Sequence, residues 1–582
     1  MPWDYVPPLA DMRFVIERVL GAPASWEECA PFADLDLETV DAVLQEAGRF
    51  AAGVLLPLNA AGDAVGCVRD AATGEVRTPP GFREAYRAFV EAGWPALPCD
   101  PAWGGQGLPL LVDAATREMF VACNHGWVMY PDLLHGAYET IKAHAGDELK
   151  ARHLADVAAG RTLAAMALTE PQAGSDLGLL RTRAEPQADG SLRISGQKIF
   201  ISGGEHDLTA QIVHLVLCRL PDAPAGTKGI SLALVPKWLP DGRRNAMHCD
   251  GIEHKTGIHG SATCAMRYEG ATGWLVGEPN RGLAAMFLMM NSARLHVGLQ
   301  GLGHQEMATQ NALRYALERA QGRSAAGGGG GADPIALHPA MRHTLLRLQS
   351  LTEGQRVIAY RAALAIDEAA HHPDAARRQA ASALAALLTP VVKAFCTHHG
   401  FHGASAALQV WGGYGYVREY GVEQSMRDAR IAMIYEGTNE IQAIDLLQRK
   451  VLADGGAALG LWLAEARAEA AACEAAGLAA FAAALIAECE AAQHATAAVA
   501  AAVAAGDREA PLRMADDYLM GLSHTLLAWA FAASARAAQG LADRPWAEAK
   551  TARMRYGVQW LLPQAAVHWQ RVRATEAVLP LV

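Results

Sequence analysis

The sequence predicts an α+β protein that is mostly helical, with a β domain between two helical regions and a further helical region towards the C-terminus. Residues 35–58 and 81–94 place apolar side chains at three- and four-residue spacing, as in amphipathic helices. Residues 166–275 instead contain short alternating runs bounded by Gly, Pro and Asp, which are typical of strands. Helical spacing returns afterwards.

At 582 residues the chain suits about three or four domains. The predicted parts are an N-terminal extension (1–34), an N-terminal helical domain (35–165), a central β domain (166–278), a C-terminal helical bundle (279–452) and an extra alanine-rich helical domain (456–582). Residues 324–334 contain five consecutive glycines without a following Gly-Lys-Ser/Thr, which indicates a flexible loop and not a phosphate cradle.

The composition of the chain limits the classes of binding partner that we expect. A formal net charge of −11 argues against nucleic acid or an anionic membrane. Ten scattered cysteines without a CxxC pair indicate free thiols, and the histidine pairs at 371–372 and 398–399 do not predict a metal site. The first residues lack the pattern of a signal peptide, and residues 385–395 look too short and interrupted to span a bilayer. We therefore expect a cytoplasmic protein without an integral membrane segment.

Two stretches belong to the β domain. In residues 165–178, Thr169 ends an apolar strand, and the turn at Gly174-Ser175 exposes N–H groups that can bind the polar edge of a heterocycle. In residues 197–207, Phe200 and Ser202 lie two positions apart on a strand and are expected on one face, where they could cover and hydrogen-bond a flat ring. An ordinary strand exit and a core phenylalanine fit these two patterns as well.

Two further stretches belong to the C-terminal bundle. Gln409 precedes a Trp-Gly-Gly-Tyr-Gly loop whose bare backbone lets a phosphate or ribose approach. Glu436 precedes Gly437-Thr438 and a helix, with Asn439 and Gln442 at capping-box spacing. A helix N-terminus favours the carboxylate, whereas burial beside an apolar ligand raises its pKa towards that of a useful base. A surface carboxylate beside a turn is the alternative. No GxGxxG follows a strand, so a Rossmann domain is not indicated.

In this order and spacing, TEPQAGSD, KIFISGG, QVWGGYGY and IYEGTNEIQ resemble the motifs of the acyl-CoA dehydrogenases. The resemblance covers about residues 35–450. It implies an N-terminal helical bundle, a central β-barrel-like domain and a C-terminal four-helix bundle. It also implies non-covalent FAD held between the β domain and the C-terminal bundle, with part of the site from a second subunit.

The resemblance assigns roles to individual residues. Glu436 matches the catalytic base, and Ala293, at the position where some relatives carry the base instead, cannot act as one. The residues that match FAD contacts are Thr169, Ser175, Phe200, Ser202, Arg319, Gln409, Gly413, Thr438 and Glu440, of which Arg319, Gln409 and Gly413 would reach the neighbouring subunit's FAD. The residues that match substrate contacts are Ser175, Asn291, Arg294, Tyr435 and Gly437, with Asn291 replacing an acid often found there.

The implied reaction converts an acyl-CoA thioester to the trans-2-enoyl-CoA by α-proton abstraction and β-hydride transfer to flavin N5. PPLADMRFVIERVL near the N-terminus, KTGIHGSATC at 255–264 and the helical tail resemble a long bacterial branch of this family that includes 3-methylmercaptopropionyl-CoA dehydrogenases. This implies a homodimer, an electron-transfer flavoprotein as acceptor, and either 3-methylthiopropanoyl-CoA or a medium- or long-chain acyl-CoA as substrate.

Three alternatives stay open. An acyl-CoA oxidase would share the fold and the glutamate but pass electrons to oxygen. A DNA-associated flavoprotein of the same fold should carry a basic C-terminal region, whereas residues 456–582 contain ten basic and twelve acidic residues. A purely structural helical protein would be colourless.

Overall fold

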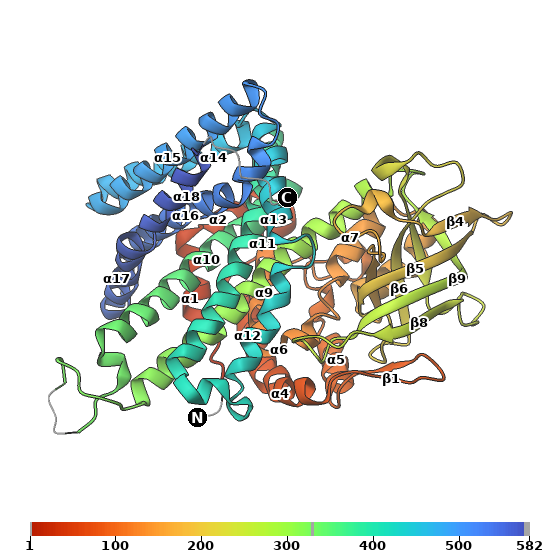
Figure 1. The fold of residues 1–582 in the computed structure, drawn as a ribbon, viewed down its shortest axis with the longest axis horizontal. Coiled ribbons are helices and arrows are strands. Elements are labelled where there is room, and N and C mark those ends of the chain that lie inside the picture. The colour runs from red at the N-terminus through yellow and green to blue at the C-terminus, as the bar shows by residue number, and fades with distance from the viewer. Residues whose placement is uncertain (1–2, 328–330, 575–582) are drawn as a thin grey trace, which may run out of the picture. The chain divides into compact units, whose positions relative to one another are not determined.

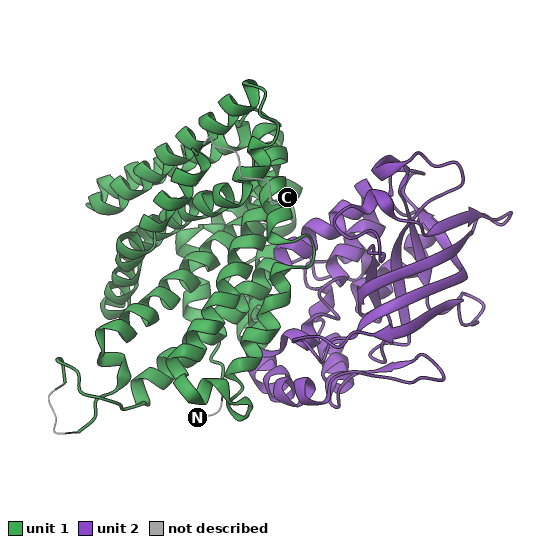
Figure 2. Cartoon of the chain, in the orientation of Figure 1, with its two compact units in different colours: residues 1–48, 109–122, 297–582 green, residues 49–108, 123–296 purple. Residues whose placement is uncertain are grey.

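The computed structural model describes residues 3–327 and 331–574, which form mostly helices together with a seven-stranded mixed sheet and a short hairpin (Figure 1). The predicted α+β, mostly helical class is confirmed. The ends of the predicted extension (1–2) and tail (575–582), and residues 328–330 of the glycine loop, lie outside the described residues. The chain divides into two compact units: residues 1–48, 109–122 and 297–582, and residues 49–108 and 123–296 (Figure 2). Helices α6 (Leu110–Val128) and α9 (Gly282–Glu318) contribute to both units.

The second unit contains a seven-stranded sheet in the order β3-β6-β7-β9-β5-β4, with β8 paired to β9. Its strands are β3 (Thr162–Ala167), β4 (Arg183–Pro186), β5 (Leu192–Ser202), β6 (Gln211–Cys218), β7 (Ser231–Pro236), β8 (Met247–Ile252) and β9 (Thr263–Val276). Among the strand pairs of the described residues, β3 and β6 run parallel and the other pairs run antiparallel. Strands β3 and β7 are buried along their whole length, which explains their continuous apolar runs. The sheet curls towards a barrel, because β4 bridges Arg219 just beyond β6, but no closed barrel forms within the described strands.

Helices and a short hairpin complete this unit. They are η3 (Ala51–Leu55), α4 (Leu56–Val65), the hairpin β1 (Val68–Arg69) and β2 (Val76–Arg77), α5 (Phe82–Glu91), α7 (Leu134–His144) and α8 (Asp147–Ala158). An aromatic cluster stabilises them: the ring of Trp127, which is fully buried, packs edge-on against Phe89 at 5.2 Å and also lies near Phe50 and Tyr86.

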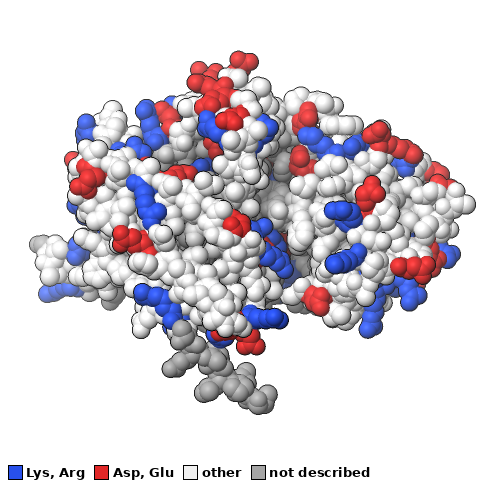
Figure 3. Space-filling view, turned by 90° about the horizontal axis from the view of Figure 1, so that it is seen from above, with Lys and Arg blue, Asp and Glu red and all other residues white. Residues whose placement is uncertain are grey.

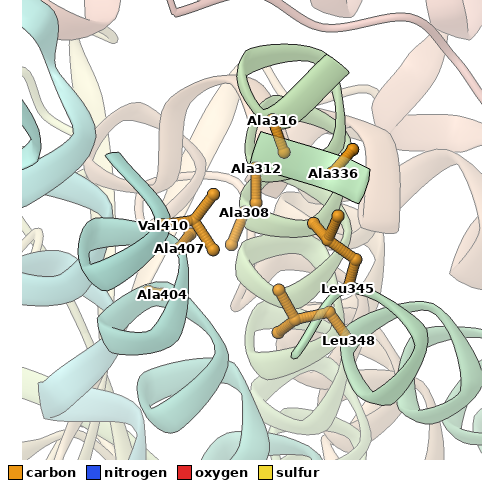
Figure 4. Close-up of a cluster of buried hydrophobic side chains, with 9 residues drawn as sticks. All are labelled: Ala308, Ala312, Ala316, Ala336, Leu345, Leu348, Ala404, Ala407 and Val410. Carbon is orange, nitrogen blue, oxygen red and sulfur yellow. The ribbon is translucent and has the colours of Figure 1, made fainter. Parts of the chain in front are cut away.

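The first unit is built on the long helices α9, α10 (Pro339–His371) and α11 (Ala375–Trp411). Helices α9 and α11 cross in backbone contact, because a Cβ atom on Gly301 would lie 2.3 Å from the carbonyl oxygen of Cys396, and one on Gly400 would lie 2.4 Å from that of Gly301. Nearer the C-terminal ends of α9 and α11, small side chains pack with two leucines of α10 into a buried cluster (Figure 4). Its members are Ala308, Ala312, Ala316, Ala336, Leu345, Leu348, Ala404, Ala407 and Val410.

Helix α11 corrects one expectation from the sequence. The apolar residues 385–395 do not form a short, interrupted stretch but lie inside this 37-residue helix, with Pro390 in its interior. By length and composition α11 is the one helix among the described residues that could cross a membrane, yet 78% of its apolar window is buried inside the protein, as in the core helix of a bundle.

The tail forms α14 (Ala457–Ala475), α15 (Ala479–Ala504), α16 (Ala510–Ala538), α17 (Arg544–Trp560) and α18 (Pro563–Val572). Helix α16 is central, and it packs against α10 and against α13 (Asn439–Ile444), the short helix that follows Glu436. The tail therefore supports the segment that carries the predicted base.

A buried charge network joins the tail to the N-terminal extension, whose elements are α1 (Leu9–Phe14), η1 (Val15–Val19), α2 (Ala22–Glu28) and η2 (Ala30–Phe32). The guanidinium of Arg356, which is 1% exposed, pairs with Glu118, Glu306 and Asp11. Lys550 of α17 also pairs with Asp11. Because buried charges are tolerated only when paired, this network fixes how extension, bundle and tail pack together.

Candidate active site

In the second unit, the loop after β3 is held beside β5 by a buried acid. Strand β3 ends at Ala167, and the carbonyl of Thr169, two residues on, accepts a hydrogen bond from the Ile199 N–H at 2.9 Å. The Glu170 carboxylate, 4% exposed, accepts bonds from the Lys198 ammonium (2.9 Å) and from the hydroxyl (2.6 Å) and N–H (3.0 Å) of Thr182. These contacts place half-buried Thr169 next to the end of β5.

The contacts of Glu170 strongly favour its ionised form. Burial alone would raise the pKa of Glu170, but the Lys198 ammonium and the donors from Thr182 and Arg181 outweigh it and lower the pKa to about 2. Lys198 is fully buried, and burial lowers its pKa against the opposing effect of Glu170. Neither member of this pair was among the predicted site residues, because their partnership depends on strand register and not on local pattern.

Phe200 lies in a β-bulge. The pairing of β5 with β9 shifts between Lys198 and Ile201, and Phe200 takes a left-handed φ of 59°. The bulge interrupts the pairing before Ile201, and burial still alternates beyond it, with Ile201 buried between the more exposed Phe200 and Ser202. The phenylalanine side chain is 59% exposed, and Ser202 is half-buried at the end of β5. An exposed aromatic ring on a strained bulge is typical of a ligand-contacting position. Ser175 is exposed on the loop that begins with Thr169.

The remaining predicted residues of this unit lie on α9. Arg294 is 6% exposed, and its Nη1 atom lies 3.5 Å from the side-chain oxygen of exposed Asn291. Ala293, between them, is buried and carries no acid. This turn of α9 thus presents an arginine but no base.

In the first unit, Glu436 lies on a left-handed bend. Its φ is 57°, and Gly437 follows at 85°. Among the described residues only five non-glycine residues have a positive φ, and two of them are the predicted site residues Phe200 and Glu436. Glu436 is half-buried, with its Oε2 atom sheltered from solvent. The hydroxyl of Tyr435, the preceding residue, donates to the side-chain oxygen of buried Gln300 on α9.

The helix after Glu436 starts one residue earlier than the predicted capping box. Thr438 is the N-cap of α13, and its hydroxyl accepts a bond from the N–H of Ile441 at 3.4 Å. Asn439 is instead the first helical residue, and its side-chain oxygen accepts a bond from Lys393 at 2.9 Å. Gln442 turns back towards the bend and does not close a box with Asn439. Glu440 is exposed, and a bond from Thr438 lowers its pKa.

A cavity of 430 Å³ lies at the other end of the bundle, beside the cluster of Figure 4. Arg319 and Gly413 line it, with the guanidinium of Arg319 over the ring of Tyr414 at 5.7 Å. Tyr315 and Trp411 stack in its wall with centroids 4.3 Å apart. Gln409 is exposed on the last turn of α11, next to this cavity's Val410. A basic, aromatic cavity with open glycine backbone suits a flat ring joined to phosphates.

Three family models match the chain. They are "Acyl-CoA dehydrogenase, middle domain" over residues 165–271, "Acyl-CoA dehydrogenase, C-terminal domain" over residues 280–451 and "Acetyl-CoA dehydrogenase C-terminal like" over residues 462–580. The fold of the chain is also similar to that of solved proteins. A Caenorhabditis elegans ACDH-11 complex with C11-CoA superposes with a TM-score of 0.78 at 18% identity, covering 97% of this chain and 92% of that one. A Bacillus anthracis acyl-CoA dehydrogenase with FAD gives 0.76 at 20% identity, covering 93% and 88%.

Two sequence relatives cover most of the chain. A 3-methylmercaptopropionyl-CoA dehydrogenase from Ruegeria pomeroyi is 45% identical over 457 residues, 78% of this chain and 77% of the relative. A broad-specificity linear acyl-CoA dehydrogenase from Mycobacterium tuberculosis is 36% identical, covering 77% of this chain and 76% of the relative. The fold of this protein and its sequence relatives together show that it is an oxidoreductase of a flavoprotein class. The chain belongs to the acyl-CoA dehydrogenase family, with an additional C-terminal domain.

Proposed function

We propose that this protein catalyses the FAD-dependent α,β-dehydrogenation of an acyl-CoA thioester to the trans-2-enoyl-CoA, with Glu436 as the base. The observation that carries the proposal is the bend at Glu436, where a carboxylate is held in a left-handed conformation beside a capped helix N-terminus. Such strain is retained where a side chain must point in one direction. The alternative base position is a buried alanine, so Glu436 is the acid left for this role.

The residues present fit FAD. In the second unit, the exposed ring of Phe200 offers an apolar surface to a flat heterocycle. Ser202 ends the same strand, and the backbone of Thr169 pairs with that of Ile199 beside it. In the first unit, the aromatic cavity with Arg319 fits the anionic adenosine diphosphate part, which we assign to the neighbouring subunit's FAD. FAD, when bound, supplies the hydride acceptor for the substrate β-carbon.

The chain's own residues prepare the substrate. The carboxylate of Glu436 removes the α-proton, and it must start ionised and sheltered from water to do so. The backbone N–H of Glu436 is assigned to the thioester carbonyl, where it stabilises the negative charge that develops as the proton leaves. Arg294 is assigned to the CoA part, where a guanidinium suits a phosphate or carbonyl oxygen.

For the substrate we propose 3-methylthiopropanoyl-CoA or an unbranched acyl-CoA of medium or long chain, after the activities that name the two relatives. An electron-transfer flavoprotein as acceptor, a homodimer and a cytoplasmic location belong to the same proposal. Nucleic acid is not a proposed partner: acidic and basic side chains are mixed over the face shown in Figure 3, and the tail has no excess of basic residues.

The test is a panel of acyl-CoA thioesters with a ferrocenium acceptor, run on wild type and Glu436→Gln. We expect a yellow wild-type protein that oxidises one or more thioesters, and a Glu436→Gln variant that keeps its flavin but loses turnover by several orders of magnitude. Rapid peroxide formation in air by the reduced wild type would instead indicate an oxidase. Near-normal turnover by Glu436→Gln would contradict the assignment of the base.

A further inference from the structure

We propose that Gln442 is the positioning residue for the base, and that its side-chain amide holds the bend on which Glu436 lies. This inference rests on the proposed function, since it explains how Glu436 is aimed. The Nε2 atom of Gln442 donates to the carbonyl oxygen of Glu436 at 3.1 Å and to that of Gly437 at 3.4 Å. One amide thus bonds two consecutive carbonyls of the bend.

Gln442 is well placed to be rigid. Gln442 is fully buried, and its backbone N–H donates to the Thr438 carbonyl at 3.0 Å. It is therefore anchored in the first turn of α13. A helical side chain leans back towards the helix N-terminus, which directs this amide at the preceding bend. A buried side chain whose amide nitrogen contacts two carbonyl oxygens of the bend has little freedom to follow a different backbone path.

The bend needs such support. Two consecutive residues, Glu436 and Gly437, have left-handed φ angles of 57° and 85°. Glycine tolerates this conformation, but glutamate is strained in it. Without the amide of Gln442, both carbonyls would lose a donor, and the strain at Glu436 could relax by rotating the peptide planes.

Rotation there would move the reacting groups. The φ angle of Glu436 relates the direction of its own N–H to the direction of its side chain, and these two groups are assigned to the thioester carbonyl and the α-proton. A displacement of about 1 Å in a reacting group costs on the order of 10²-fold in rate. Substrate affinity depends mostly on other parts of the ligand, so the loss should fall on kcat and not on KM.

The close packing at Gly437 agrees with this contact between Gln442 and the bend. A Cβ atom added to Gly437 would lie 2.7 Å from Nε2 of Gln442, so the amide packs directly against the glycine. Gly437→Ala would therefore push the same amide away while leaving Gln442 itself unchanged.

The experiment compares Gln442→Met with wild type and with the matched control Gln355→Met. Methionine keeps the length of the side chain but cannot donate. Gln355 of α10 is also a fully buried glutamine in the same unit, and its amide makes no hydrogen bond among the described residues. Flavin content, melting temperature, KM and the pH profile of kcat are measured for each, with the best thioester of the panel.

We expect Gln442→Met to keep its flavin, to keep KM within about threefold, and to lose about 10²-fold in kcat, with a shifted acidic limb in the pH profile. Gln355→Met should stay within twofold of wild type. A Gln442→Met protein that is folded and has wild-type kcat and pH profile overturns the inference. If Gln442→Met fails to fold, Gly437→Ala provides the test. A loss of kcat without a change in KM supports the positioning role of Gln442, and an unchanged kcat rejects it.

The outcomes separate the two proposals. If wild type oxidises no thioester, or if Glu436→Gln stays active, the proposed function itself fails. If wild type is active and Glu436→Gln is inactive while Gln442→Met behaves as wild type, only the positioning role of Gln442 fails.

Discussion

The bulge at Phe200 and the bend at Glu436 solve the same local problem with different chemistry. Each holds a non-glycine residue at a left-handed φ, 59° and 57°. The bulge is secured by a buried ion pair, Glu170 with Lys198, next to the register shift in β5. The bend is secured by neutral groups, the cap at Thr438 and the amide of Gln442.

The difference matches the roles that we propose for the two places. A buried ion pair gives a stable, fixed platform but depends on both charges being present. Neutral donors fix a backbone without adding charge beside a carboxylate whose protonation must be free to change. The comparison therefore predicts that the bulge responds to charge and pH, and that the bend responds to small changes in geometry.

The largest effect is expected from breaking the ion pair. Glu170→Gln leaves the Lys198 ammonium buried without its counter-charge, which should lower the free energy of unfolding by about 3–5 kcal/mol. Urea denaturation measures this. The control is Glu185→Gln, which removes the exposed pair with Arg193 on the same sheet and should cost less than about 1 kcal/mol. Equal losses in the two variants would contradict a special role for the buried pair.

The same pair predicts a pH dependence. The pKa of Glu170 is about 2 in the folded protein against an ordinary 4.5, so its contribution is fully present above pH 4.5 and is lost as the pH falls from 4.5 towards 2. Over that window the shift corresponds to about 3 kcal/mol in the free energy of unfolding. Denaturation at successive pH values should show a shallower dependence for Glu170→Gln than for wild type. Parallel curves would show that Glu170 is not the titrating group.

Shortening the side chain of Glu436 should lower kcat. Glu436→Asp retracts the carboxylate by one methylene, and the clamped backbone cannot follow, so kcat should fall by about 10²-fold while flavin content stays unchanged. Glu419→Asp, the same change on exposed η10 (Arg418–Tyr420), serves as control. A Glu436→Asp variant with more than half of the wild-type kcat would mean that the position of the carboxylate is not critical.

The smallest effect is expected from removing the backbone strain at Phe200. Phe200→Gly should raise the stability of the flavin-free protein by about 1 kcal/mol, because glycine adopts the left-handed φ without cost, while FAD binding weakens. Asp222→Gly, at φ 56° on an exposed loop, should gain less because aspartate tolerates this region. Thermal unfolding of flavin-free protein checks both, and a lower melting temperature for Phe200→Gly would show that its ring stabilises the fold.

Much of this picture could be predicted from the sequence, and the rest depended on long-range pairing. Periodicity predicted the alternation of helical and β regions, and the motifs singled out Phe200 and Glu436, two of the five described non-glycine residues with a positive φ. The bulge could not be predicted, since it depends on the register of β5 against β9. The same holds for the contact of Tyr435 with Gln300, which lie 135 positions apart. The cap was misplaced by one residue because Thr438 and Asn439 are both good capping residues.

The central claim, that Glu436 is the base, is tested most directly by anaerobic stopped-flow mixing of flavin-loaded protein with the best thioester of the panel. Wild type should bleach its flavin within a turnover time, whereas Glu436→Gln, with the same flavin content, should bleach slower by about 10²–10⁴-fold, the usual contribution of a general base, or more. Flavin bleaching by Glu436→Gln at a rate close to that of wild type would contradict the account.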